Sequence, residues 1–194
     1  LVDKNLIFEN EVKILPGTKF LIKPNKHIVF KRKVSAEGTK ELPIIFKKNQ
    51  KGDKPWGTVA IIGKGSKESI LDNVIFQGGS GGNLNQYKFL SMLSIHNSSD
   101  IKLSNSKFSF NELFDDTIHI IYSSNILLKN IEIKNAYSDA IDIDISSNVI
   151  LKNVKIKDSK NDGVDFMESK AIIENLEVVN SQDKGVSIGE NSDV

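Results

Sequence analysis

The sequence predicts an all-β fold, a right-handed parallel β-helix in which every turn of the solenoid, called a rung here, contributes three short strands. The first reason is a repeat of 22 to 23 residues, whose blocks open at Ile118, Ile141, Val164 and Val186. The second is an asparagine column of nearly the same period, at Asn105, Asn130, Asn153 and Asn175. Self-similarity at a fixed period of this length is the sequence signature of a solenoid.

Each repeat contains three runs in which apolar and polar residues alternate, the pattern of half-buried strands. One repeat reads Ile126–Lys129, then Ile131–Lys134, and after a short loop Ile141–Asp144. The connections are too short for βαβ crossovers, so each strand is expected to pair in parallel with its equivalent one rung away, at about 4.8 Å. Asparagine suits the bends, because it tolerates left-handed backbone geometry and can hydrogen-bond to the asparagine of the next rung.

One domain is expected over residues 1–194, with less regular rungs in 1–92 and regular rungs of 22 to 25 residues in 93–194. The Gly-rich stretch 78–87 is expected to be a long loop at a rung corner. The first strand of each repeat should supply one stacked core, made of Ile118, Ile120, Ile141, Ile143, Val164, Phe166, Val186 and Ile188. The chain starts without Met and its last rung lacks a cap, so we expect a longer natural chain or a stacking partner.

Composition narrows the functional classes. Lys and Arg total 26 and Asp and Glu total 25, giving a net charge of +1, which predicts no nucleic-acid partner. Cysteine is absent, which excludes disulfides, a thiolate nucleophile and Cys-ligated metals. The apolar runs are only a few residues long, so no membrane span is expected.

Several segments resemble known β-helix proteins. Leu15–Thr18, Pro43–Phe46 and Pro55–Val59 resemble the opening coils of secreted bacterial β-helix proteins, and Ser138–Ile143 and Asn161–Phe166 resemble rungs of the pectate-lyase-like superfamily. This resemblance implies a β-helix, an extracytoplasmic location (secreted, periplasmic or cell surface) and carbohydrate chemistry. A further segment, Asp183–Glu190, is similar to β-helix regions of CotH-type secreted proteins. The Gly-His-Gly and Arg-Ile-Lys motifs of polygalacturonases are missing, so that family's mechanism is not carried over.

An acidic strip is the candidate site. The outward positions of the first strands should align His119 with Asp142 and Asp165, and Asp144 should lie beside them. Asp116, Asp139 and Asp162 should form a corner column just before these strands. Like charges that face each other on adjacent strands are destabilising. The charges of Glu132, Lys155 and Glu177 alternate on another face, whereas the strip is uniformly acidic, so we expect a bound cation, a raised carboxyl pKa or a cationic ligand there.

Two classes of function follow from the strip. The first is a polysaccharide lyase or hydrolase whose candidate catalytic residues are Asp142, Asp165, His119 and Lys184. The second is a non-catalytic surface or glycan-binding scaffold that binds Ca²⁺, with candidate ligands Asp142, Asp144, Asp165, Asp139 and Asp162. The corner aspartates have a simpler alternative role as turn caps. Arg32 is the only arginine and lies far from the strip, which favours a neutral or amino sugar over an acidic one.

Overall fold

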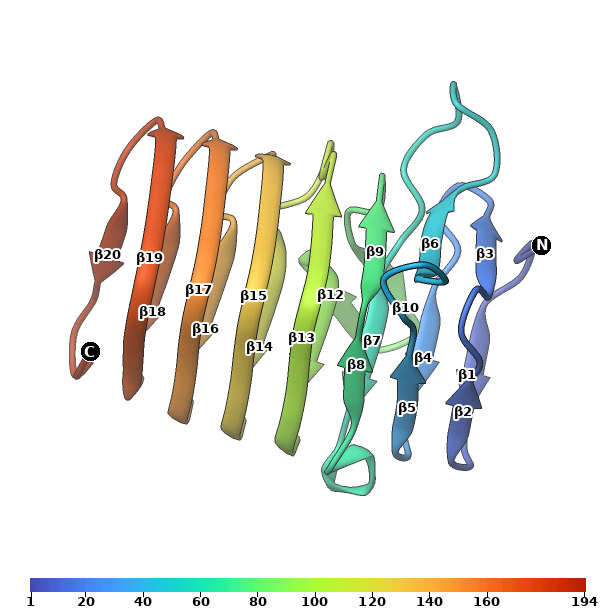
Figure 1. The fold of residues 1–194 in the computed structure, drawn as a ribbon, viewed down its shortest axis with the longest axis horizontal. Helices are drawn as coiled ribbons and strands as arrows, with labels where there is room; N and C mark the ends of the chain where they lie inside the picture. Colours follow the sequence, from blue (N-terminus) through green and yellow to red (C-terminus); the bar gives the residue numbers. More distant parts are fainter.

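The computed structural model describes residues 1–194 as a solenoid of parallel strands, with the two termini at opposite ends of its long axis (Figure 1). The all-β prediction is confirmed. The only helix is a single 3₁₀ turn, η1 (Lys64–Ser66). No helix of the structure has the length and apolarity that crossing a bilayer requires.

One sheet contains the first strand of every rung, with eight parallel strands stacked along the axis. In order they are β1 (Leu6–Phe8), β4 (Ile28–Phe30), β7 (Val59–Ile62), β12 (Ser91–His96), β14 (Asp116–Ile121), β16 (Ile141–Asp144), β18 (Val164–Met167) and β20 (Val186–Ile188). This sheet, called the site sheet below, has the register that the repeat predicts. Ile118 pairs with Ile141, and Ile141 pairs with Val164.

The second sheet contains the rest of each rung. Its early rungs have two separate strands each: β2 (Val12–Ile14) and β3 (Lys19–Ile22), β5 (Val34–Glu37) and β6 (Ile44–Lys48), β8 (Ile70–Asp72) and β9 (Val74–Gln77). Its later rungs have one long strand each: β13 (Ser99–Ser109), β15 (Ser124–Ala136), β17 (Ser147–Ser159) and β19 (Ala171–Ser181). The expected three strands per rung therefore hold for the early rungs. In the later rungs two of them join, and β13 pairs with both β8 and β9.

Asparagines bend the long strands without breaking their pairing. Asn105, Asn130, Asn153 and Asn175 have φ between 48° and 60°. The amide Nδ2 of Asn130, Asn153 and Asn175 donates to the Oδ1 of the asparagine one rung earlier, at 2.8–3.0 Å. This confirms the predicted ladder. A second ladder joins Asp100, Asn125 and Asn148.

The core is a column of side chains inside the coil. Six of the residues predicted to fill it are fully buried, namely Ile118, Ile120, Ile141, Ile143, Val164 and Phe166. Val186 is half-buried and packs against this core, as predicted, whereas Ile188 is 56% exposed because β20 pairs on one side only, with β18. From the early rungs to β13, phenylalanines stack inside the coil with ring centroids 4.6–5.0 Å apart, namely Phe20, Phe46, Phe76 and Phe108.

The Gly-rich stretch differs from the expected loop. It forms an antiparallel hairpin of β10 (Gly82–Leu84) and β11 (Tyr87–Phe89). Leu84 and Phe89 pack against Val29, Ala60 and Ile62 on the outer side of the site sheet. Burial of this second apolar cluster explains why the segment is ordered, since a hairpin alone is marginally stable in water.

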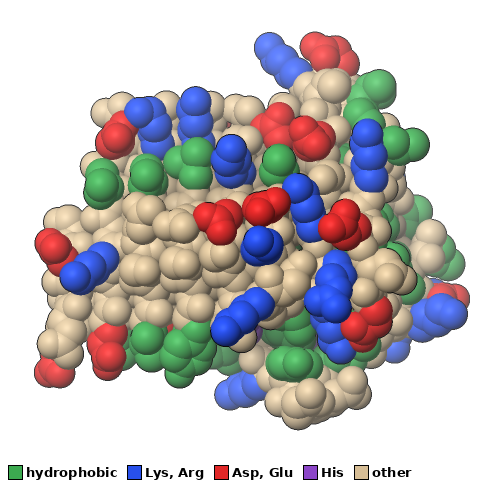
Figure 2. All heavy atoms as spheres, turned by 90° about the horizontal axis from the view of Figure 1, so that it is seen from below, with side chains coloured by type: hydrophobic (Ala, Val, Ile, Leu, Met, Phe, Trp, Pro, Cys, Tyr) green, Lys and Arg blue, Asp and Glu red, His purple; other side chains and the backbone are tan.

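Surface charges of both signs are interspersed along the solenoid. Viewed from below, lysines lie beside carboxylates, hydrophobic side chains gather in separate patches, and neither sign of charge dominates (Figure 2). This face carries no basic stripe of the kind that binds a nucleic-acid backbone.

Candidate functional site

The acidic strip lies on the outer side of the site sheet. Register pairs Ser94 with His119, His119 with Asp142, and Asp142 with Asp165, so the predicted column is confirmed. Asp144 lies in the next column, where it pairs with Ile121 and Met167. The structure therefore brings His119, Asp142 and Asp144 together over two rungs, with Asp165 one rung further along.

His119 lies between two carboxylates. Its Nε2 is 3.3 Å from Asp144 Oδ2 and 3.7 Å from Asp142 Oδ2. The histidine is only 5% exposed, whereas the Asp142 and Asp144 side chains are 17% and 26% exposed. A substrate would therefore meet the carboxylates first and leave the imidazole behind them. The ring of His96 meets the His119 ring edge-on at 5.1 Å, and burial lowers the pKa of His96 to about 4.

Asp116 completes the cluster. It is 1% exposed, and its Oδ2 has no hydrogen-bond partner. Its carboxylate, the His119 ring and the Asp142 carboxylate each offer one atom within 4.8 Å of the others. Burial and then the neighbouring Asp142 raise the pKa of Asp116 far above its ordinary range. Sequence reasoning treated Asp116 as a turn cap and missed this position.

The other corner aspartates join neighbouring rungs by hydrogen bonds rather than capping their own turns. Asp139 Oδ1 accepts hydrogen bonds from the Asp162 backbone N–H at 2.7 Å and from Asn161 Nδ2 at 2.8 Å. Asp162 Oδ1 accepts from the Lys184 N–H at 2.8 Å. Asp116 has no equivalent bond. The amide of Asn161 that donates to Asp139 has no counterpart for Asp116, because Ser138 occupies the equivalent position.

Lys184 stands apart from the carboxylate cluster. Its side chain is half-exposed, and its Nζ bonds to Asp183 Oδ2 at 2.7 Å. That hydrogen bond raises the pKa of the Lys184 ammonium group, so the lysine is held protonated. A protonated lysine can bind an anionic group but is not a base.

Burial dominates the electrostatics of the strip. It raises the pKa of Asp142 to about 7; His119 acts in the opposite direction, and Asp144, Asp165 and Asp139 act in the same direction as burial. Asp116 and Asp142 lie close together, so their titrations are coupled and the pair holds protons to a higher pH than ordinary carboxyls do. The site therefore places two carboxyls of raised pKa, Asp116 and Asp142, beside the more exposed Asp144 side chain.

The two ends of the strip differ in access. The hairpin closes one end, where the Phe89 ring lies 5.6 Å from His96. The other end is open at Asp165. Exposed apolar side chains border the strip where the site-sheet strands end: Tyr122 is 60% exposed, Ile145 43% and Met167 50%. These side chains give the carboxylates an exposed apolar border, in which Tyr122 is the aromatic member.

The chain belongs to the right-handed β-helix family. The family model described as "Right handed beta helix region" matches residues 91–194. These rungs contain the whole cluster of Asp116, His119, Asp142 and Asp144.

Among solved structures, the chain is similar to the catalytic domain of a GH87 alpha-1,3-glucanase in complex with nigerose, with 13% identity and a TM-score of 0.55. That match covers 95% of this chain and 32% of the glucanase domain, so the chain spans about a third of its length. The enzymatically active domain of tailspike protein 2 from bacteriophage CBA120 matches at 12% identity and a TM-score of 0.44, over 95% of this chain and 42% of that domain. No curated protein matches the sequence.

Proposed function

We propose that the chain hydrolyses a polysaccharide outside the cytoplasm, with Asp142 as proton donor and Asp144 as the carboxylate that activates water. The proposal depends chiefly on one contact: the buried, unpartnered Asp116 carboxyl lies against Asp142 and His119 beneath an open sheet face. A carboxyl pair shielded from water shares a proton, and a general acid needs such a proton. Similarity of fold to a glucanase catalytic domain supports the substrate class. The pectate-lyase-like resemblance of the rungs supports the location.

Hydrolysis needs a proton on the leaving glycosidic oxygen and a water molecule at the anomeric carbon. Asp142 gives its proton to that oxygen as the carbon–oxygen bond breaks, and Asp144 takes a proton from the water that attacks the carbon. His119 contacts both carboxylates and returns this proton from Asp144 to Asp142. Asp165 borders Asp142 on the open side and is the alternative base.

A lyase acting on a uronate has less support. It would use a lysine or arginine base, and Lys184 is held protonated by Asp183. Arg32, the only arginine, lies on the early rungs beside Gly65. Recognition of an acidic sugar usually uses arginine side chains, so we propose a neutral polysaccharide as substrate.

Release of reducing ends from neutral glucans, α-1,3-glucan among them, tests the proposal. Asp142→Asn and Asp144→Asn should each lower the rate about 10²- to 10⁴-fold, as removal of an acid or base does. Glu177→Gln is the control, because this exposed carboxylate pairs with Lys155 on the other sheet. Equal rates in wild type and both aspartate variants would refute hydrolysis at this site.

Cation binding is the second candidate function, because the side chains of Asp116, His119 and Asp142 are close enough to share one ion. The expected Ca²⁺ prefers oxygen ligands such as Asp142, Asp144 and Asp165, whereas the imidazole of His119 suits Zn²⁺ or Mn²⁺. Asp139 and Asp162 already accept backbone hydrogen bonds, so they have less capacity left for a metal. In this scaffold role the chain would bind glycan without cleaving it.

Thermal melting separates a cation from a shared proton. A bound cation stabilises the fold by RT ln(1 + [L]/Kd), so millimolar Ca²⁺, Mn²⁺ or Zn²⁺ should raise the Tm of wild type but not of Asp116→Asn. If the pair holds a proton instead, the cations leave Tm unchanged and Asp116→Asn melts higher than wild type. Stacking of the last rung on further rungs or another subunit stays a prediction.

A further inference from the structure

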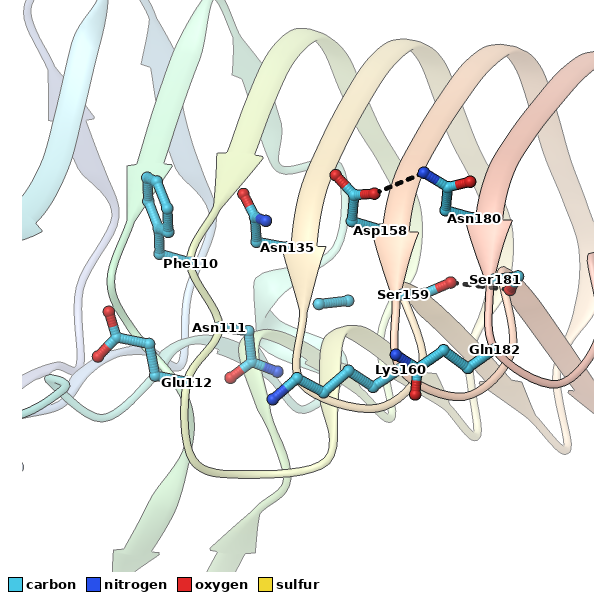
Figure 3. A pocket seen from close by; sticks show the side chains of 11 residues that line it. Phe110, Asn111, Glu112, Asn135, Asp158, Ser159, Lys160, Asn180, Ser181 and Gln182 are labelled. Carbon is cyan, nitrogen blue, oxygen red and sulfur yellow. Dashed lines mark hydrogen bonds between the residues drawn. The ribbon is translucent and has the colours of Figure 1, made fainter.

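A groove of about 440 Å³ runs across the later rungs, where the long strands β13, β15, β17 and β19 end (Figure 3). Nine of its eleven lining residues are polar. The carboxylates of the acidic strip do not line it. A second hollow shares Lys160 with this groove and reaches Asp115, the neighbour of Asp116.

One column of side chains in the groove departs from the ladder pattern. Phe110, Asn135, Asp158 and Asn180 follow paired positions on successive strands, and all have φ between 57° and 62°. In the two asparagine ladders the residues with this geometry are Asn or Asp, whereas the corner that follows the site sheet also places Tyr122 and Ile145 in it. A phenylalanine costs more in left-handed geometry than asparagine does. Phe110 nevertheless occupies the corner, with 45% of its surface exposed.

Phe110 also leaves Asn135 without a partner in the ladder. Elsewhere each amide donates to an oxygen one rung earlier, as Asn180 does to Asp158 at 3.0 Å. The phenyl ring offers no acceptor, and the Asn135 side chain makes no hydrogen bond within the protein. A free amide therefore lies one rung, about 4.8 Å, from an exposed aromatic ring. Figure 3 shows both side chains on the same wall of the groove.

The carboxylates of the groove are already paired. Glu112 forms an ion pair with Lys48 at 2.6 Å, and Asp158 accepts the Asn180 amide. The ammonium group of Lys160 lies 5.0 Å from the centre of the Tyr137 ring. The hydroxyl groups of Ser159 and Ser181 bond to each other, so what remains for a ligand is one aromatic face and the amides of Asn135 and Gln182. This chemistry fits an uncharged ligand that is rich in hydroxyls.

We propose that this groove is a second glycan-binding site, which holds an uncharged sugar chain by stacking on Phe110 and hydrogen bonds to Asn135. The choice of a glycan as ligand rests on the proposed function. The second hollow, which shares Lys160 with this groove, gives the sugar chain a path from the groove towards Asp116. The groove would retain an insoluble substrate while the carboxylates act on it.

Phe110→Asn is the decisive variant, because it installs the residue that the ladders use at this corner. It relieves the backbone cost of phenylalanine and gives Asn135 an acceptor, so its Tm should equal or exceed that of wild type. Its retention on insoluble α-1,3-glucan in a pull-down assay should fall at least tenfold. Phe110→Tyr, which keeps an aromatic ring, should retain binding. Leu15→Asn, which removes an apolar residue that is 62% exposed on an early rung, should bind like wild type.

The outcomes separate this groove from the acidic strip. Loss of retention in Phe110→Asn, with retention preserved in Asp142→Asn, supports the groove even where no cleavage is detected. Loss of cleavage in Asp142→Asn, with normal retention in Phe110→Asn, supports the strip and overturns the groove. Failure of wild type to bind a panel of insoluble neutral glucans would also overturn the groove. A lower Tm together with lost retention in Phe110→Asn would overturn the groove proposal as well, since Phe110 would then have a structural role.

Discussion

In residues 1–92 the rungs differ in length and are joined inside the coil by stacked phenylalanines, whereas in residues 93–194 they are nearly equal and are joined outside by asparagine ladders. Paired residues of the site sheet are 31 and 34 residues apart between β4, β7 and β12, but 22 to 25 apart afterwards. Equal rungs bring every corner into register, so side chains at the corners can hydrogen-bond. Unequal rungs shift the corners, and only the core-facing positions remain stacked.

The junction of the halves shows this directly. Asn73 has the same left-handed geometry as the ladder asparagines, with φ of 50°. It does not join the ladder, because the Asn105 amide donates to Asp72 instead. The insertion that makes the longest rung carries the covering hairpin, which ends beside the carboxylates. The irregular half thus supplies the closed end of the candidate site, and the regular half supplies its acids.

The largest expected effect tests the phenylalanine stack. Phe76→Ala should lower the free energy of unfolding by about 3–5 kcal/mol, because it removes a buried ring that stacks on Phe46 and Phe108. Urea denaturation measures this change. A loss below 1 kcal/mol would show that the stack contributes little and would weaken the contrast between the halves.

Truncation in the regular half should cost somewhat less. Ile143→Ala removes a fully buried aliphatic side chain between two rungs, so we expect a loss of about 2–5 kcal/mol in the same assay. Lys155→Ala, on an exposed face, provides the baseline. A truncation at Ile143 no worse than this baseline would contradict the stacked core.

The carboxylate cluster should make stability depend on pH. The folded-state pKa of Asp142 and of Asp116 is raised, so the folded protein keeps a proton that the unfolded chain loses near pH 4. From about pH 4 up to the raised pKa values, the free energy of unfolding therefore falls as pH rises. Buried His27 and His96, whose pKa values are lowered to about 4, act in the opposite direction up to about pH 6.5. Because the two effects oppose each other below about pH 6.5, the decline in the free energy of unfolding should appear above that pH.

Asp116→Asn isolates that contribution. It removes the buried carboxyl, so the variant should be more stable than wild type by about 1–3 kcal/mol at pH 8, with a flatter pH dependence. Denaturation at pH 5 and pH 8 gives the comparison. A variant that is less stable at both pH values would indicate that Asp116 is stabilised by a bound cation, as in the second candidate function.

The smallest expected effect concerns the ladders. Asn153→Ala loses two ladder hydrogen bonds and places a side chain poorly suited to left-handed geometry at the bend, for a loss of about 1–2 kcal/mol. Asn153→Gly loses the bonds but accepts the geometry, so it should be less damaging. Equal losses for the two variants would assign the whole effect to the hydrogen bonds.

The sequence was a better guide to the regular half than to the irregular half. The register of His119, Asp142 and Asp165 could be predicted because a fixed period of 23 residues determines which side chains stack. The hairpin could not, because its order comes from Leu84 and Phe89 packing on residues more than 20 positions away. The Gly-rich composition of that segment indicated only flexibility.

By itself, the sequence determined the solenoid, its asparagine ladder and the acidic column, since all three follow from a period that local residues repeat. Only the tertiary structure decided what each acid does. Asp116, Asp139 and Asp162 occupy equivalent positions in the repeat, yet two accept backbone hydrogen bonds and the first is buried without a partner. The depth of burial and the neighbours on adjacent rungs set a carboxyl's pKa, and neither is encoded in a spacing.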